Sequence, residues 1–221
     1  MAFIKEVIKK RSSVESENVP CVVAGNSLGG FTALYASADA SAEEEKLING
    51  CILINAAGRF KKNASEPKPE DAAWIANIKA SVSRFVIGLS FIYTKQPMRI
   101  EQVLKQVYPV DSSMVDAELV DSIQYPAQDP NAPEVFYRVI AKNGSGPPVF
   151  IDDLLKNFKV PLLLLWGMAD PWIRPSAADS IEELFPSAVR VNIDGGHCVH
   201  DECPGEANKA IADFMQVCNK S

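Results

Sequence analysis

Residues Val22 to Phe31 read VVAGNSLGGF, and this stretch indicates the fold more strongly than any other in the chain. Its apolar start predicts a short buried strand, and the residues after it predict a helix. Between them, Gly25, Ser27 and Gly29 form the order Gly-x-Ser-x-Gly, which is typical of a sharp strand-to-helix turn. Ser27 is therefore expected at the carboxyl end of a strand and at the start of a helix. The alternative is that this stretch only caps the helix with glycine and serine residues and has no catalytic role.

Three further apolar runs predict buried strands: Cys51–Asn55, Val160–Trp166 and Val189–Ile193. The first two, like the run Cys21–Ala24, are nearly continuous in aliphatic residues, which favours parallel strands covered on both faces. Helical patterns lie between the runs, and a last helix is predicted over Pro204–Val217, where proline suits the first turn. Strands that alternate with helices predict an α/β protein with a mostly parallel, doubly wound sheet.

Residues 59–159 separate the second predicted strand from the third, a distance far longer than an ordinary crossover. Helical patterns interrupted by proline and glycine fill this stretch: Trp74–Tyr93, Ile100–Val107, Met114–Ile123 and Pro133–Ala141. We expect a helical insertion, or lid, folded over one edge of the sheet. The core domain then comprises residues 1–58 and 160–221.

The composition is that of an ordinary soluble globular protein, with 47% hydrophobic and 23% charged residues among 221. Lysine and arginine number 22 against 28 acidic residues, and the resulting net charge of −6 disfavours a nucleic-acid partner. No transmembrane segment is expected, because no run offers the roughly 20 apolar residues of a membrane span. The best candidate, Val82–Tyr93, is too short and contains Arg84.

Cysteine and histidine usage gives no sign of a disulfide framework or a metal site. The five cysteines are an odd number without framework spacing, and the sequence contains no CxxC motif. With two histidines in the chain, a structural zinc site has little support, so no metal is expected. By default, we expect the protein to reside in a reducing compartment.

A serine nucleophile needs a general base at neutral pH, and the two histidines, His197 and His200, are the candidates. His197 follows a predicted strand that ends in Asp194-Gly195-Gly196, which places it on a loop at the strand's carboxyl end. Open α/β sheets form their ligand crevices there, so we predict His197 as the base. His200 lies where the chain turns into the last helix, and a structural role is expected for it.

The imidazole needs a carboxylate to orient it, and Asp170 is the first choice. It follows an apolar run and a turn, so it too is expected at the carboxyl edge of the sheet. The chain order Ser27, Asp170, His197 is the order of one known class of catalytic triad. Asp194 is the rival acid, but it shares a loop with His197 and is expected to form an Asx-type turn.

Three signatures, in this order, resemble the α/β-hydrolase superfamily in its lidded form: GNSLGG at 25–30, LWGMADPW at 165–172 and GHCVHDECP at 196–204. The last is similar to the family's ending G-H-x-x-x-x-E-x-P. Three other phrases resemble the plant, algal and cyanobacterial pheophytinase-like hydrolases: LINAAG at 53–58, VLKQVY at 103–108 and YPAQDP at 125–130. The resemblance covers nearly the whole chain from Val22 onward.

This resemblance implies a serine hydrolase in which Ser27, activated by His197 and Asp170, attacks a small hydrophobic carboxylic ester and forms an acyl-enzyme that water hydrolyses. It implies that the backbone N–H of Leu28 stabilises the oxyanion and that no cofactor is needed. A phytylated pigment such as pheophytin fits the resemblance. A generic esterase or lipase, or a carbon–carbon bond hydrolase, is the alternative enzyme. The compartment implied is the plastid, although these first residues lack a transit peptide, and the cytoplasm is the alternative.

Three residues are candidates for the substrate pocket: Asn26, Trp172 and Phe85. Phe85 belongs to an apolar series in residues 82–93 of the predicted lid that would cover an oily substrate. The alternative is that the lid helices need an apolar underside simply to dock on the sheet.

The sequence departs from the family before the Gly-x-Ser-x-Gly turn. The family's sheet has eight strands, and a His-Gly loop after the third supplies a second oxyanion donor, whereas residues 1–20 here predict one helix and a polar connector. We therefore expect a partial α/β-hydrolase fold, its C-terminal half, that lacks four strands. An exposed strand edge would then promote self-association, and the lost donor would cost about 2.7–4 kcal/mol of transition-state stabilisation. A catalytically inactive fragment or binding module is the second interpretation.

Overall fold

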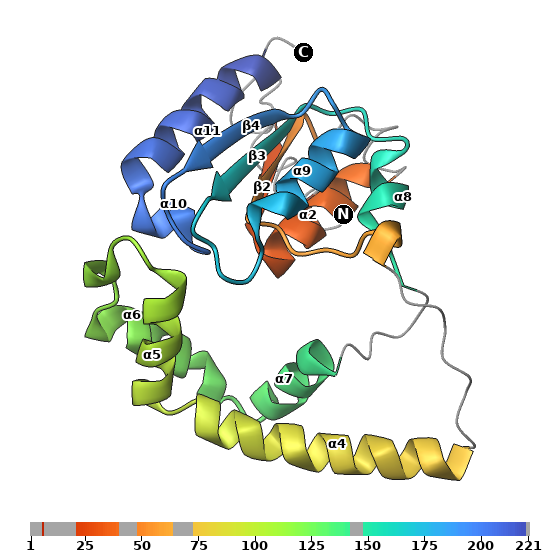
Figure 1. Cartoon of the computed structure of the whole chain (residues 1–221), viewed down its shortest axis with the longest axis vertical. Helices are drawn as coiled ribbons and strands as arrows, with labels where there is room; N and C mark the ends of the chain where they lie inside the picture. The colour runs from red at the N-terminus through yellow and green to blue at the C-terminus, as the bar shows by residue number, and fades with distance from the viewer. Residues whose placement is uncertain (1–5, 7–20, 40–47, 64–72, 142–147, 220–221) are drawn as a thin grey trace. The chain divides into compact units, whose positions relative to one another are not determined.

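The structure is a computed structural model that describes residues 6, 21–39, 48–63, 73–141 and 148–219 (Figure 1). The chain divides into two compact units. The core unit comprises residues 1–63, 107–111 and 149–221, and the helical unit comprises residues 64–106 and 112–148. The core unit thus includes residues 59–63, 107–111 and 149–159, which lie inside the predicted insertion of residues 59–159. A lid role for the helical unit stays a prediction, and the predicted helix and connector of residues 1–20 fall, except for Glu6, outside the described residues.

The described part of the core unit is built on a sheet of four parallel strands in the order β1-β2-β3-β4 (Figure 1). Each predicted strand lies within two residues of an observed one, so the predicted α/β class is confirmed. The elements of this unit are β1 Val22–Asn26, α2 Leu28–Ala38, β2 Gly50–Ile54, η1 Lys61–Asn63, α8 Ile151–Leu155, β3 Leu162–Gly167, α9 Pro175–Leu184, β4 Val189–Ile193, α10 Val199–Glu202 and α11 Pro204–Cys218.

Helices cover both faces of this sheet, as the continuous apolar strands require. On one face, Leu162, Leu164 and Trp166 of β3 belong to a buried cluster with residues of α2, α8 and α9. On the other face, Leu163 and Leu165 belong to a second cluster with residues of α10 and α11. Figure 1 shows α11 on one side of the sheet and α2 and α9 on the other. Every residue of β2 and β3 is buried, so these two strands form the centre of the core.

Strand β1 lies at an edge of the described sheet. It pairs in parallel with β2, from Val22 opposite Gly50 to Asn26 opposite Ile54, and no other described strand pairs with it. None of its residues is fully buried, and Ala24 is exposed. An unpaired strand edge is a template for pairing with another chain, so self-association through β1 stays a prediction with a structural basis.

The helical unit is described by itself. Its elements are α4 Ala73–Thr94, α5 Pro97–Val107, η2 Ser112–Met114, α6 Ala117–Gln124, η3 Pro126–Gln128 and α7 Ala132–Ile140. Helices α4 and α7 pack together: the rings of Phe91 and Phe136 lie 5.2 Å apart, and the guanidinium of Arg84 lies 4.7 Å from the ring of Tyr137. Arg84 also pairs with Glu134. None of the helices in the described ranges is long and apolar enough to cross a membrane.

Candidate active site

Ser27 occupies a strained turn between β1 and α2, which we call the elbow (residues 25–29). Its φ of 54° and ψ of −119° are unusual for a residue with a side chain, and such a conformation costs about 1–3 kcal/mol. The backbone N–H of Ser27 donates to the carbonyl of Ile54 at 3.0 Å, and the Ser27 carbonyl accepts from Ala57 at 2.9 Å. Its side chain makes no capping hydrogen bond to α2. The alternative of a simple serine helix cap therefore finds no support.

A glycine is required at position 25 of the elbow. A Cβ atom there would lie 2.2 Å from the backbone of Gly29, a separation that real Cβ atoms essentially never show. The structure has the strand, turn and helix that the Gly-x-Ser-x-Gly motif requires, whereas a Cβ atom at Gly29 would meet no atom within 4 Å.

His197 and Asp170 form a buried hydrogen-bonded pair. His197 Nδ1 lies 2.7 Å from Asp170 Oδ2, and both side chains are almost fully buried. Asp170 lies on the loop after β3 and His197 on the loop after β4, so two adjacent parallel strands deliver them to the same edge of the sheet. The bond at Nδ1 leaves Nε2 as the ring nitrogen able to accept a proton.

The Asp170 carboxylate is held in its ionised form. Burial raises the pKa of Asp170, but hydrogen bonds from His197 and from the backbone N–H groups of Ile173 and Trp172 outweigh it and bring the pKa below its ordinary value. The two backbone donors reach Asp170 Oδ1 at 3.0 and 2.7 Å. An ionised carboxylate in this place orients the imidazole and stabilises it when it becomes an imidazolium.

Asn26 connects the elbow to the histidine loop. Its Nδ2 donates to the carbonyl of His197 at 2.8 Å and to the carbonyl of Ile54 at 3.2 Å. The residue immediately before Ser27 is thus bonded to the residue predicted as its base. The amide of Asn26 has a structural task that the sequence did not reveal, and its predicted contact with substrate stays a prediction.

Asn55 is a further polar residue of the site, and the sequence analysis gave it no role. It follows β2, is fully buried and has a φ of 40°. Its Nδ2 donates to Asp170 Oδ2 at 2.7 Å, and its Oδ1 accepts from the backbone N–H of Gly167 at 2.9 Å. Asn55 therefore fixes the oxygen that His197 also contacts. A polar residue directly after a wholly apolar parallel strand was the available signal, because the ends of such strands line the functional edge.

Glu202, the glutamate of the ending G-H-x-x-x-x-E-x-P, is a second buried group of the site. Its carboxylate accepts the backbone N–H groups of Val110 at 2.7 Å and Asp111 at 2.9 Å, and also that of Gly196. The N–H of His197 donates to the carbonyl of Val107 at 3.0 Å. Glu202 thus joins residues 107–111 to the loop that carries the histidine, and it compensates backbone donors that would be costly to bury alone.

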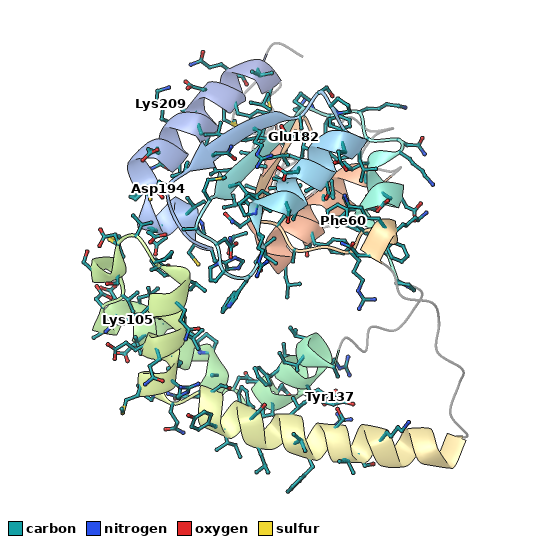
Figure 2. The ribbon with its side chains drawn as sticks, viewed as in Figure 1. Phe60, Lys105, Tyr137, Glu182, Asp194 and Lys209 are labelled. Atoms are coloured by element: carbon teal, nitrogen blue, oxygen red, sulfur yellow. The ribbon has the colours of Figure 1, made fainter. Side chains whose placement is uncertain are left out.

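Asp194 and His200 were the alternative candidates for the acid and the base. Asp194 is exposed on the surface of the core unit (Figure 2), and it is Asp170 that is hydrogen-bonded to His197. His200 lies in the short helix α10 and is exposed.

Leu28, Trp172 and Phe85 are the remaining predicted site residues. Leu28 is the first residue of α2, where backbone N–H groups lack partners within the helix, as an oxyanion donor requires. Trp172 is half exposed, and its ring centre lies 5.0 Å from that of His197. Phe85 lies on α4 in the helical unit. Contact of Trp172 and Phe85 with substrate stays a prediction.

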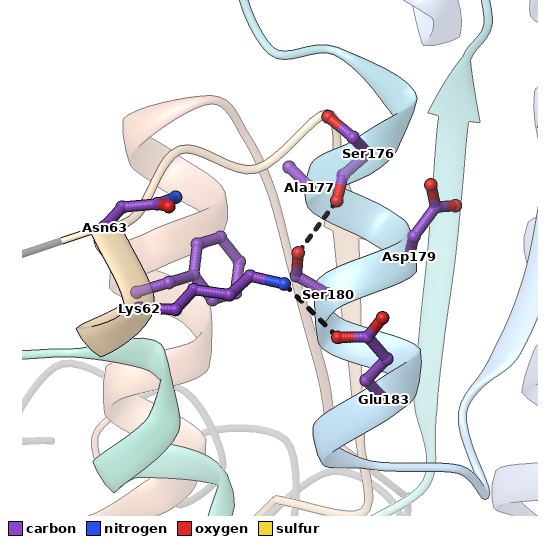
Figure 3. Close-up of a pocket in the computed structure, with 8 residues that line it drawn as sticks. Lys62, Asn63, Ser176, Ala177, Asp179, Ser180 and Glu183 are labelled. Carbon is purple, nitrogen blue, oxygen red and sulfur yellow. Dashed lines mark hydrogen bonds and ion pairs between the residues drawn. The ribbon is translucent and has the colours of Figure 1, made fainter.

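A pocket elsewhere in the core unit is not this site. It has a volume of about 380 Å³ and lies between η1 and α9, where Lys62 pairs with Glu183 at 3.2 Å and Ser180 Oγ donates to the carbonyl of Ser176 at 2.9 Å (Figure 3). None of its lining residues is a predicted site residue.

The sheet, the elbow and the Asp–His pair define a class of protein. The chain matches the Alpha/beta hydrolase family over residues 2–210 and belongs to that family. Its fold is an α/β-hydrolase fold of which the described residues form four parallel strands and several helices.

Within the family, the chain is similar to "Pheophytinase, chloroplastic" of Arabidopsis thaliana, with 32% identity over 225 residues. The match covers 97% of this chain and 43% of the plant protein. A second relative, the uncharacterized hydrolase YugF of Bacillus subtilis, is 26% identical over 88% of this chain and 65% of its own length. The chain therefore spans less than two thirds of either relative.

Solved structures share the fold at low sequence identity. The meta-cleavage product hydrolase of Pseudomonas fluorescens IP01 superimposes with a TM-score of 0.61 at 19% identity, over 97% of this chain and 71% of that protein. A bacterial membrane phospholipase A gives a TM-score of 0.62 at 19% identity, over 99% of this chain and 63% of that one.

Proposed function

We propose that the chain is a serine hydrolase that cleaves a hydrophobic carboxylic ester with Ser27, His197 and Asp170. The observation that carries the proposal is the 2.7 Å hydrogen bond between His197 Nδ1 and Asp170, formed beside an elbow whose Asn26 is bonded to His197 itself. This arrangement supports an oriented base whose backbone is bonded to the residue before a strained serine, and a serine with an oriented base is what nucleophilic catalysis requires.

The proposed reaction has two halves. His197 Nε2 takes the proton of Ser27 as Oγ attacks the ester carbonyl carbon, and the N–H of Leu28 stabilises the negative oxygen of the tetrahedral intermediate. The carbon–oxygen bond to the alcohol then breaks, and His197 returns the proton to the leaving alcohol. Water, deprotonated by His197, then attacks the acyl carbon on Ser27. The bond from this carbon to Oγ breaks, His197 returns the proton to Ser27, and the carboxylic acid leaves.

A phytyl-ester pigment is the proposed substrate class. It is supported by the 32% identity to a protein named pheophytinase, together with the lid phrases that resemble that group. The second candidate is a carbon–carbon bond hydrolase, because the same fold occurs in a meta-cleavage product hydrolase. The name of the plant relative also makes the plastid the proposed compartment, which localisation of the tagged full-length gene product in its own cells would test.

Ester turnover tests the function. We expect the chain to hydrolyse p-nitrophenyl esters and a phytylated pigment, with the pigment preferred over short-chain esters. Ser27→Ala should abolish turnover, and His197→Ala should lower kcat by at least about 10³-fold, because the residues of the proposed triad act together. Turnover of a meta-cleavage product but of no ester would favour the second candidate. Folded protein that turns over none of these substrates would support the binding-module interpretation.

A further inference from the structure

Large apolar side chains form an exposed stripe along one face of α4. Their spacing of three, four and seven residues places them together over about three helical turns. The α4 stripe consists of Val82, Phe85, Val86, Leu89, Ile92 and Tyr93. Each of these side chains is between 53% and 68% exposed. A continuous exposed apolar surface of this kind marks an interaction site more often than it occurs by chance.

The packing of the helical unit uses a different face of α4. Phe91 contacts Phe136, and Arg84 reaches Glu134 and the ring of Tyr137, all three on α7. Arg84 and Phe91 are seven residues apart and share a helical face, and the centre of the stripe is roughly 150° around the helix from that face. The stripe is therefore not the surface that holds α4 in its own unit.

The segment that carries the stripe contains basic residues and no acidic ones. Residues 73–100 contain no acidic residue, although the whole chain has a net charge of −6. The basic residues of this segment are Lys79, Arg84, Lys95 and Arg99. Arg84 and Lys95 belong to the face that packs against α7, because Arg84 pairs with Glu134 and Nζ of Lys95 lies 5.6 Å from the Phe91 ring. The guanidinium of Arg99 lies 4.7 Å from the centre of the Tyr93 ring, so one cation lies directly beside the stripe. Lys79 precedes Val82 by about one turn, at the other end.

We propose that the α4 stripe docks on an anionic phospholipid bilayer, with α4 lying in the plane of the interface. An apolar face with aromatic residues, flanked by cations and free of acidic residues, is the pattern of a helix that rests on a membrane. The stripe would enter the boundary between headgroups and acyl chains, while Lys79 and Arg99 at its two ends contact anionic headgroups. This proposal goes beyond the proposed hydrolase function and does not depend on it.

An anionic bilayer fits this surface better than a second copy of the chain does. Two copies joined through the stripe would bring the same cations together, and like charges across an interface disfavour association. Anionic headgroups complement those cations instead.

Co-sedimentation of the 221-residue chain with vesicles tests the proposal. We expect at least about tenfold tighter binding to phosphatidylcholine vesicles that contain phosphatidylglycerol than to pure phosphatidylcholine, with affinity falling as salt rises. The double variant Val86→Glu, Leu89→Glu should lose at least about tenfold in affinity. Lys79→Gln should lose about fivefold on the anionic vesicles and keep its weak binding to neutral ones.

Two control variants separate this surface from the rest of the protein. Leu184→Glu changes an exposed apolar residue of α9 in the core unit, and Ser27→Ala removes the proposed nucleophile; both should bind vesicles like the parent chain. Far-UV circular dichroism would establish that the double variant keeps its helices. Equal vesicle binding by the parent and the folded double variant would overturn the proposal. So would a double variant that dissociates an oligomer in sedimentation velocity but binds vesicles unchanged, since a second copy would then be the occupant.

Discussion

The side-chain amide of Asn26 donates a 2.8 Å hydrogen bond to the carbonyl oxygen of His197. These residues are 171 positions apart in the sequence, and each adjoins a different strand at the carboxyl edge of the sheet. The same amide nitrogen also bonds the carbonyl of Ile54. The mutual position of the proposed nucleophile and base therefore depends on one neutral side chain as well as on the sheet.

Asn26→Ala should lower activity more than it lowers stability. Two carbonyls would lose a donor, at a cost of about 1–3 kcal/mol in the free energy of unfolding, and the histidine loop would lose its bond to the elbow. Because small misplacements of reacting groups are costly, we expect kcat to fall by about 10–100-fold. Ester turnover and urea unfolding would measure the two effects. Asn63→Ala, at an exposed position, is the control, and unchanged kcat in folded Asn26→Ala would contradict this role.

The backbone conformation of Asn55 and its side-chain amide should contribute separately to the stability of the fold. Asn55→Gly accepts the φ of 40° but removes the bonds to Asp170 and Gly167, so we expect it to cost about 1–3 kcal/mol in stability. Asn55→Ala should cost about 1–2 kcal/mol more, because alanine is strained in this conformation. Urea unfolding of both variants checks the order. Equal stability of the two would show that the backbone conformation carries no cost.

The stability contributed by Asp170 should depend on pH. Its pKa in the folded protein lies below the ordinary value of 3.8, so the ionised side chain stabilises the fold fully above that pH. As the pH falls below 3.8, the unfolded chain takes up the proton first and the contribution is lost. The difference in unfolding free energy between the parent and Asp170→Asn should therefore decrease over this acidic range. Exposed Asp121→Asn serves as the comparison, and a difference that grows on acidification would refute the assignment.

The edge of β1 should make the chain self-associate. In β1, alternate residues direct their backbone N–H and C=O groups toward β2. The backbone groups of Val22, Ala24 and Asn26 point the other way, to the open edge of the described sheet. A charged side chain on an edge strand opposes edge-to-edge pairing, and Ala24→Lys should therefore shift the chain toward monomer. Analytical ultracentrifugation across a concentration series measures this shift. A parent chain that is monodisperse, monomeric and unfolds cooperatively would count against the prediction.

The sheet could be predicted from sequence because its strands are short, apolar and separated by helices. Leu162–Trp166 is a run that only a doubly covered strand can bury, and it lies in β3. The elbow was equally accessible, because Gly25 answers a local steric demand that the motif itself expresses, although a Cβ atom at Gly29 would meet no atom within 4 Å. Strand ends were less accurate: Asn55 was placed in a strand, but its positive φ ends β2 at Ile54.

The supporting residues of the site could not be predicted in the same way. Asp170 and His197 have a recognisable chemistry and chain order, and they are found hydrogen-bonded. Asn55 acts on a carboxylate 115 positions away, and Glu202 acts on backbone groups some 90 positions away, so neither has a local pattern that identifies its partner. Their roles follow from which loops the sheet brings together, and that information exists only in three dimensions.

Labelling with a fluorophosphonate probe, followed by mass spectrometry of the modified peptide, tests the central claim most directly. The probe requires a serine activated by its base, so we predict one adduct on Ser27 that disappears in Ser27→Ala and falls sharply in His197→Ala. A folded chain that takes up no probe, or one labelled at another serine, would contradict the proposal that Ser27, His197 and Asp170 form a working triad.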